Sequence, residues 1–305
     1  MILMTRIVAK FGAAALAALL LTAPSFATEN LAFVSASGSG AACTAAQPCA
    51  SVVDALNAIP KPVRVICLEG AARNQTSLSF LSTSVIDIDC PQGVFAQLGV
   101  DGANSMLTVR HLNFTPEGFG SGVAIFGSGT VILEDCTFMG GIGSAAVDIE
   151  PNGPLNVVIR NSRISNNSAG ILLKPSSGGS IHATLDHATI SQNAGGGIKI
   201  DTTNGPVTVD ITDSVIGDNA GNGLNAVGGA NQNMVSIKNS VIAKNGVAGI
   251  QANGANAAVL VQTTLLDQNA SGATSVVGGG HISTYGNNSI VGSSGSGFTG
   301  SAPLQ

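Results

Sequence analysis

The sequence has few aromatic and few charged residues. It contains no tryptophan and one tyrosine, and charged residues make up 10 % of its 305 residues. Aromatic rings supply much of the contact area in ligand clefts, so this composition argues against a tight carbohydrate binder. The net charge of −5 produces no strong positive potential, which argues against nucleic acid and acidic membrane surfaces as partners.

A helix-length apolar period is also missing. Instead an Asn-centred turn, I-S-N-N-S-A-G-I at 164–171, recurs in four further copies. A fixed period of this length indicates a solenoid, and units rich in Val, Ile, Thr, Asn and Gly predict short strands. The sequence therefore predicts an all-β solenoid with one coil of a β-helix per repeat. The central asparagines lie 26, 26, 26 and 24 residues apart: Asn167, Asn193, Asn219, Asn245 and Asn269.

These asparagines are predicted to form a structural ladder. Asparagine tolerates the left-handed backbone region and hydrogen-bonds within its own turn, so it suits the bend between two strands. In coils about 4.8 Å apart, the amide of one asparagine is expected to donate to the carbonyl of the next.

Three short strands per coil are predicted to supply the core. Alternation along each strand sends every second side chain inward, and like residues stack on like. The first strand contributes Val131, Leu133, Val157, Ile159, Val209, Ile211, Val235 and Ile237; the second contributes Phe138, Ile164, Ile190, Ile216, Ile242 and Leu266; the third contributes Val147, Ile149, Ile171, Leu173, Ile198, Ile200, Leu224 and Ile250.

Residues 1–27 are typical of a secretory signal peptide. Arg6 and Lys10 supply the charged start, residues 13–21 the apolar segment, and Ser25-Phe26-Ala27 the cleavage pattern. The alternative, an uncleaved membrane anchor, is disfavoured because the apolar run is short for a span of about 20 residues. Cleavage after about Ala27 predicts a secreted or periplasmic protein without a membrane span in the mature chain.

An oxidising compartment allows disulfides. Cys43 and Cys49 are close enough in sequence to bridge, and Cys67 and Cys90 lie 23 residues apart, about one coil. Stacked positions would bring Cys67 and Cys90 within the range of a disulfide, although pairing across the two sets stays open. Cys136 occupies the place held by serine in other coils, which predicts a small buried filler.

The segment before the coils is predicted to cap them. Ser51 and Asp54 form a capping pattern for a helix over 52–59, whose apolar face is predicted to contain Val52, Val53, Leu56 and Ile59. Pro60 stops the helix, and terminal capping units are expected in solenoids. The predicted organisation is a cap over 28–62, a β-helix over 63–292 and a flexible tail over 293–305.

The coils resemble the right-handed parallel β-helix repeats of the pectin-lyase-like superfamily over most of residues 30–292. The opening F-V-S-A-S-G-S-G-A-A-C…P-C-A-S-V-V-D-A-L, with the I-C-L and I-D-C strands, is similar to small secreted bacterial β-helix repeat proteins. Most of that group have no assigned activity. The resemblance implies a single-stranded right-handed parallel β-helix, and one fold hosts many functions.

Resemblance to pectate lyases implies a place for chemistry. In those enzymes, acidic residues on the outer face of the first strand hold calcium, and an arginine or lysine takes the proton. The low-ranked candidates here are therefore Arg160, Asp186 and Asp210. Calcium needs about 6–8 oxygen ligands, whereas Asp186 and Asp210 supply two, joined by Asp213. The outward column that matches this face reads Glu134, Arg160, Asp186, Thr212, Lys238 and Gln262.

The favoured interpretation of this column is a stripe in which Glu134, Arg160 and Asp186 pair with one another. His187 falls at the corner held elsewhere by Asp135, Asn161, Asp213 and Asn239, which predicts a turn residue. Polygalacturonase-type clusters of aspartate with Gly-His-Gly are absent from the sequence.

The sequence thus predicts a secreted structural or surface-interaction protein that recognises extracellular glycan or protein, without a cofactor or metal. The variable connections over 175–180 and 227–233 are the expected recognition loops. The alternative is a polysaccharide lyase or hydrolase with a non-standard site on the first-strand face, and calcium belongs to that alternative only.

Overall fold

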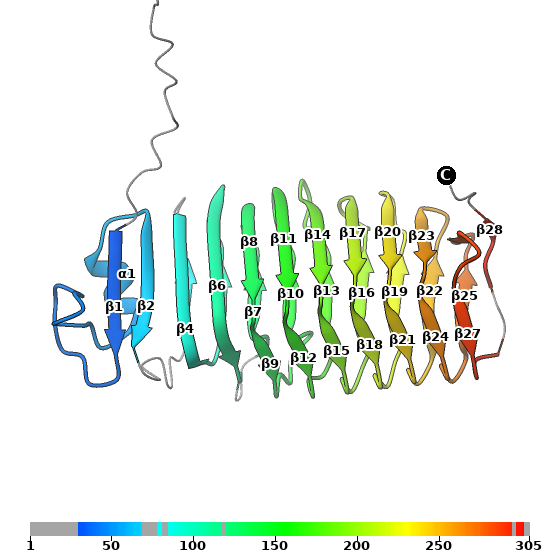
Figure 1. Ribbon diagram of the computed structural model, residues 1–305. Helices are drawn as coiled ribbons and strands as arrows, with labels where there is room; N and C mark the ends of the chain where they lie inside the picture. Colours follow the sequence, from blue (N-terminus) through cyan, green and yellow to red (C-terminus); the bar gives the residue numbers. More distant parts are fainter. Residues whose placement is uncertain (1–29, 69–77, 81–84, 117–119, 295–296, 302–305) are drawn as a thin grey trace, which may run out of the picture.

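The computed structural model describes residues 30–68, 78–80, 85–116, 120–294 and 297–301. Their strands stack side by side along one axis, which makes an elongated solenoid with β1 near one end and β28 near the other (Figure 1). All strand pairs that join neighbouring coils are parallel, as in β11 with β14 and β13 with β16. The predicted all-β parallel β-helix is confirmed.

Each coil contains up to three strands, and these form two sheets of 19 and 9 strands. The larger sheet carries two faces, because β4 and β6 run through the corner between the first and second strands and pair on both sides of it. The first-strand face consists of β1 (Asn30–Ser35), β2 (Val63–Leu68), β4 (Val85–Phe95), β6 (Ser105–Phe114), β8 (Gly129–Glu134), β11 (Pro154–Arg160), β14 (Ser180–Asp186), β17 (Val207–Thr212), β20 (Asn233–Lys238), β23 (Ala257–Gln262), β26 (His281–Thr284) and β28 (Gly300–Ser301).

The second-strand face completes the larger sheet and the third strands form the smaller one. The second strands are β9 (Thr137–Met139), β12 (Arg163–Ser165), β15 (Thr189–Ser191), β18 (Val215–Gly217), β21 (Val241–Ala243), β24 (Leu265–Asp267) and β27 (Ser289–Val291). The third strands are β3 (Leu78–Phe80), β5 (Leu98–Val100), β7 (Val123–Ile125), β10 (Val147–Ile149), β13 (Ile171–Leu173), β16 (Ile198–Asp201), β19 (Leu224–Val227), β22 (Ala248–Asn253) and β25 (Gly272–Val277).

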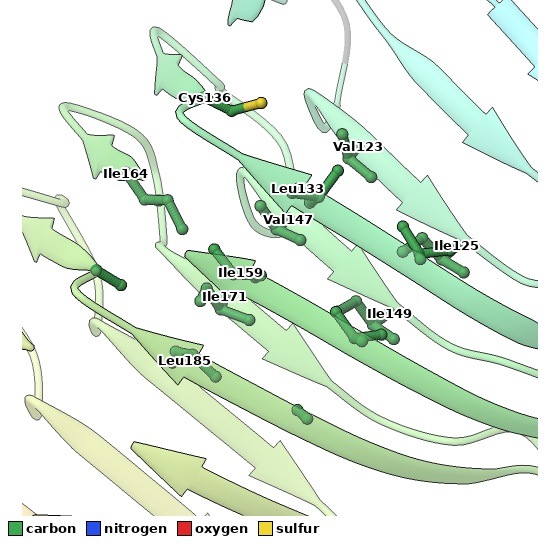
Figure 2. Close-up of a cluster of buried hydrophobic side chains, with 14 of the residues drawn as sticks. Val123, Ile125, Leu133, Cys136, Val147, Ile149, Ile159, Ile164, Ile171 and Leu185 are labelled. Atoms are coloured by element: carbon green, nitrogen blue, oxygen red, sulfur yellow. The ribbon is translucent and has the colours of Figure 1, made fainter. Parts of the chain in front are cut away.

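The core runs along the axis between these faces. Every side chain that alternation predicted to point inward is buried, and Figure 2 shows part of this interior, where Leu133, Ile159 and Leu185 from successive first strands face Ile149 and Ile171 from third strands. Burial of a branched aliphatic side chain contributes roughly 1.5–3 kcal/mol, so the repeated columns supply the main stabilisation of a chain with few aromatic residues.

The asparagine ladder is present, with one correction to its geometry. Nδ2 of Asn167 donates to Oδ1 of Asn193 at 3.1 Å, and the series continues to Asn269 at 2.9–3.0 Å. The ladder residues do not have the left-handed backbone. The residue before each of them does: Asn166, Gln192, Asp218, Lys244 and Gln268 all have positive φ.

This arrangement turns each ladder side chain inward. The five asparagines are buried, and Nδ2 of Asn193 also donates to the carbonyl of Ile164 in the preceding coil at 3.3 Å. The prediction that the side chain bonds its own turn is therefore wrong for Asn193: it bonds the coils on both sides. Buried polar groups need such partners, because an unsatisfied one costs about 1–3 kcal/mol.

A second set of left-handed residues forms the corner between the first and second strands. His187 is one of them with φ of 51°, as its corner position predicted. We call this set the first corner; its members share a φ between 47° and 57° and are His111, Asp135, Asn161, His187, Asp213, Asn239 and Thr263.

The N-terminal coil is covered by α1 (Val52–Ala58), which contacts β1 and β2. Ser51 caps it as predicted, since Oγ of Ser51 accepts from the backbone N–H of Asp54 at 3.0 Å. The helix ends one residue earlier than predicted, because Ile59 before Pro60 is extended. Its buried face contains Val52, Ala55 and Leu56, whereas Val53 is exposed, as the 3.6-residue period requires.

Both predicted disulfides are present. Cys43 pairs with Cys49 and Cys67 with Cys90, each with Cα atoms 4.6 Å apart. Cys136 is free and buried, and its desolvation raises the pKa of the thiol to about 12. It therefore serves as the predicted filler.

The proposed signal peptide over residues 1–27 lies outside the described residues. In the segment predicted as a tail, Gly300 and Ser301 form β28, which pairs with β26. None of the described helices is long and apolar enough to cross a membrane.

Candidate functional site

The outer surface of the first-strand face carries the candidate residues. Parallel registration places the last residues of β8, β11 and β14 directly above one another, so Glu134, Arg160 and Asp186 form one column. The column continues to Thr212, Lys238 and Gln262, as predicted. The column arises in the same way as the columns of inward residues: coils of equal length place equivalent residues above one another.

Glu134 is the centre of an ion-pair network. Nε of Arg160 lies 2.8 Å from Oε1 of Glu134, and Nε of Arg110 lies 3.0 Å from Oε2. The hydrogen bond from Arg160, and after it the one from Arg110, outweigh partial burial and lower the pKa of Glu134. Arg110 also binds Asp87. The guanidinium groups on both sides of Glu134 are thus directed toward carboxylates.

The predicted pairing of Arg160 with Asp186 is wrong. Among the described residues, no ion pair joins them, because the guanidinium of Arg160 turns toward Glu134. Asp186 instead accepts from Oγ1 of Thr212 at 3.0 Å, and its Oδ1 lies 2.8 Å from Nδ1 of His187. The predicted series of charge pairs is therefore interrupted between Arg160 and Asp186.

Sequence reasoning missed the N-terminal half of this network. Arg64 lies 3.5 Å from Asp87 and 3.6 Å from Asp89, which extends the pairing to β2. The signal was present in the sequence: basic and acidic residues alternate in sign at intervals close to one coil. The alternation is hard to recognise near β4, because the coil length is irregular there and the register shifts between Asp89 and Gly93.

Of the three aspartates proposed as calcium ligands, Asp210 lies apart from the other two. Nε2 of His182 lies 3.3 Å from Oδ2 of Asp210, whereas Asp186 is the last residue of β14, beside the first corner. Ligand atoms of Asp186, His187 and Asp213 lie within 4.8 Å of one another. The predicted group therefore keeps Asp186 and Asp213, loses Asp210 and gains His187.

A shallow groove crosses the amino-terminal halves of the first strands. It holds a cavity of about 320 Å³ lined by Asp210, Met234, Leu260 and His281, among others. Thr208 links it to a second depression of about 240 Å³ beside His182. We call the two together the strand groove. One register column runs along it, in the order Asn156, His182, Thr208, Met234, Ala258 and His281.

The residues on this face do not fit calcium. A calcium ion takes about 6–8 oxygen ligands, yet Asp87, Asp89 and Glu134 are paired with arginines and Asp210 with a histidine. The carboxylates that do converge, Asp186 and Asp213, share their position with an imidazole. Among the residues of this face that the structure describes, no oxygen cage is therefore found, and no lyase step through calcium follows from them.

Comparisons with known proteins agree with this architecture. A family model described as a right-handed β-helix region matches residues 94–210. The crystal structure of pectate lyase Pel9A is similar at a TM-score of 0.66 and 17 % sequence identity, over 92 % of this chain and 80 % of that chain. A search of curated protein sequences finds no match. At this identity the likeness concerns the fold alone, and the structure is a parallel β-helix as in that neighbour.

Proposed function

We propose that this chain is a secreted, non-catalytic β-helix protein that acts at a surface, with the strand groove as its contact site for extracellular glycan or protein. The observation that carries the proposal is the pairing of charges on the first-strand face. Arg110 and Arg160 are both held by Glu134, so the face presents neither a free arginine base nor a calcium cage beside it.

The strand groove supports a binding role for an extended partner. Its register column presents one outward side chain per coil, about 4.8 Å apart, so a linear polymer lying along the axis meets another side chain of the groove at each step. Met234, which is 52 % exposed, supplies an apolar contact, and the pair of His182 and Asp210 supplies polar groups beside it.

Secretion is part of the proposal. The charged start, apolar segment and Ser25-Phe26-Ala27 pattern support a cleaved signal peptide. Two disulfides are consistent with this, because disulfides persist in oxidising compartments. Expression in a bacterial host with a functional secretion pathway should yield an exported protein whose mass corresponds to a chain starting at Thr28.

Activity and binding are tested on the purified mature protein. We expect no cleavage of a panel of uronate-containing and neutral glycans, with or without added calcium. Immobilised glycans and extracellular proteins are then screened for retention of the protein. A partner of the strand groove should lose binding to Met234→Glu.

Met106→Glu is the matched control. Met106 is exposed and lies in the same register column as Met234, beyond the groove. Equal loss of binding in both variants, or none in either, would refute the groove as the contact site.

The second candidate function is a polysaccharide lyase or hydrolase with a non-standard site. The fold similarity to pectate lyase Pel9A favours it, as does the position of Asp186 next to Arg160 in one column. Activity on any glycan of the panel that disappears in Arg160→Ala or Asp186→Asn, with the fold retained by circular dichroism, would replace the non-catalytic proposal with this one.

A further inference from the structure

We propose that Asp186, His187 and Asp213 form a binding site for a divalent transition-metal ion such as Zn²⁺. These residues, which we call the corner triad, come from the ends of two adjacent first strands. Asp186 is the last residue of β14, His187 follows it, and Asp213 follows β17. Their ligand atoms lie within 4.8 Å of one another, which is close enough for one ion to contact all three.

The corner backbone produces this convergence. His187 and Asp213 both have positive φ, at 51° and 49°, and the N–H of His187 donates to the carbonyl of Thr212 at 3.2 Å. The two side chains therefore leave the same corner of neighbouring coils. Asp186 precedes His187 and points outward, so its carboxylate reaches the same place.

The corner triad has unused ligand capacity. In the described part of the chain, no hydrogen bond or ion pair of the Asp213 carboxylate is found, nor one of Nε2 of His187. Arg160 is held by Glu134, and no ion pair links Lys238 to either aspartate in the same part of the chain. Two carboxylates this close repel each other, and a bound cation would remove that repulsion.

The donor set selects the class of metal. One imidazole nitrogen with carboxylate oxygens suits Zn²⁺ and similar transition metals. Calcium prefers oxygen ligands alone and more of them. All three residues are exposed or half-buried, so water or an oxygen of a partner molecule has access to the remaining coordination positions.

His111, a second histidine at the first corner, provides a comparison for His187, because its ring nitrogens have different neighbours. Nδ1 of His111 lies 2.8 Å from Asp89, and Nε2 lies 3.7 Å from Asp135. Both ring nitrogens thus face carboxylates on opposite sides. The residue before His111 is Arg110, whose charge disfavours a cation, whereas the residue before His187 is an aspartate. At His111 both ring nitrogens therefore face carboxylates, whereas at His187 only Nδ1 does so among the described residues and Nε2 stays open.

The test measures metal binding to the full mature chain by isothermal titration calorimetry with Zn²⁺. Wild type is expected to bind one Zn²⁺ per chain at this site. His187→Asn and Asp213→Asn should each weaken binding at least about tenfold, because even loss of an outer-shell partner costs about 10–100-fold. Asparagine occupies the same left-handed corner at Asn161 and Asn239, so these variants preserve the backbone.

His111→Asn is the matched control, and its Zn²⁺ affinity should equal that of wild type within about twofold. Zn²⁺ should also raise the Tm of wild type and of His111→Asn, but not that of His187→Asn, since ligand binding to the folded state stabilises it. Mn²⁺ provides an independent readout, because its paramagnetism should broaden the amide signals of Asn161 and Asn239.

Three results would overturn the proposal. The first is the absence of saturable Zn²⁺ binding by wild type. The second is an equal loss of affinity in His111→Asn and His187→Asn, which would indicate nonspecific histidine binding. The third is displacement of Zn²⁺ by equimolar Ca²⁺, which would indicate an all-oxygen site elsewhere. Each result leaves the proposed function of the strand groove unaffected.

Discussion

The coils before β11 and the coils from β11 onward are held together differently. In the N-terminal coils, contacts of several kinds are combined: two disulfides, a Phe95–Phe114–Phe138 series, and arginines alternating with carboxylates. In the later coils, like groups meet: asparagine on asparagine, and serine on serine, as where the N–H of Ser214 donates to Oγ of Ser240 at 3.2 Å.

Coil length also differs between the two regions. In the later coils, register partners such as Val131, Val157, Ala183 and Val209 are 26 residues apart, so the same residue returns to the same place and a ladder can extend. In the earlier coils, Val63, Ile86 and Leu107 are 23 and 21 residues apart. The asparagine ladder tolerates a change from 26 to 24 residues between Asn245 and Asn269, whereas the described earlier coils are joined by a disulfide, aromatic rings and ion pairs.

The largest expected effect tests the aromatic part of the N-terminal coils. Phe114 is fully buried and stacks on Phe138 with ring centroids 4.7 Å apart. Phe114→Ala should lower the free energy of unfolding by about 3–5 kcal/mol, measured by urea denaturation. Met106→Ala on the same strand should change it by less than about 0.5 kcal/mol. Similar losses in both would show that the aromatic series does not hold these coils.

The second prediction concerns the disulfides. Cys67 and Cys90 are 23 residues apart and Cys43 and Cys49 are 6 apart. The chain-entropy relation predicts losses of about 3.4 and about 2.4 kcal/mol when each pair is replaced by alanine. Urea midpoints of the two double variants measure the difference. A larger loss for the Cys43–Cys49 pair would mean that the cap, and not the coil staple, limits stability.

The third prediction tests the asparagine ladder of the later coils. Asn219→Ala removes the acceptor for Nδ2 of Asn193 and the donor to Oδ1 of Asn245, all buried. We expect a loss of roughly 2–3 kcal/mol, since one unsatisfied buried group costs about 1–3 kcal/mol. Asn156→Ala, an exposed asparagine on β11, is the control. A loss no larger than that of the control would remove the ladder from the stabilising interactions of these coils.

The smallest expected effect concerns the ion pairs. Glu134→Gln should lower the free energy of unfolding at neutral pH by less than about 1 kcal/mol. The folded state lowers the pKa of Glu134, chiefly through Arg160. Its stabilisation is therefore complete above the unfolded pKa of about 4.3, and it is lost as the pH falls through the lower folded pKa.

Unfolding measured from neutral to acidic pH should show the wild-type and Glu134→Gln curves converging on the acid side. Glu150→Gln is the control, because no ion pair of Glu150 is found within the described ranges. Curves that diverge on acidification would contradict the assignment of the pairing to Glu134.

Much of the fold could be predicted because the repeat is regular. The period locates the ladder from Asn167 to Asn269, and alternation identifies the inward residues. The left-handed residue was misplaced by one position, at Asn219 instead of Asp218. Both residues tolerate that conformation, so local propensity does not indicate which of them adopts it. Packing decides, because a left-handed Asp218 turns the Asn219 amide into the core.

The candidate site was less predictable. Register places Glu134, Arg160 and Asp186 in one column, so Arg160 has a carboxylate on each side. The sequence does not indicate which of the two carboxylates its guanidinium binds. Its side chain turned toward Glu134, which Arg110 also binds. Likewise Asp186, Asp210 and Asp213 were equivalent as carboxylates, and the corner backbone brought Asp213 rather than Asp210 to His187.

The sequence by itself determined the coil, its period and the residues that stack inside it, because constant spacing and alternation translate directly into which side chains lie above one another. Only the tertiary structure decided which charged groups meet on the outer face. Long side chains on an exposed column reach more than one neighbour. Which partner each of them binds depends on the backbone direction at the corners and on the charged groups that other coils place nearby.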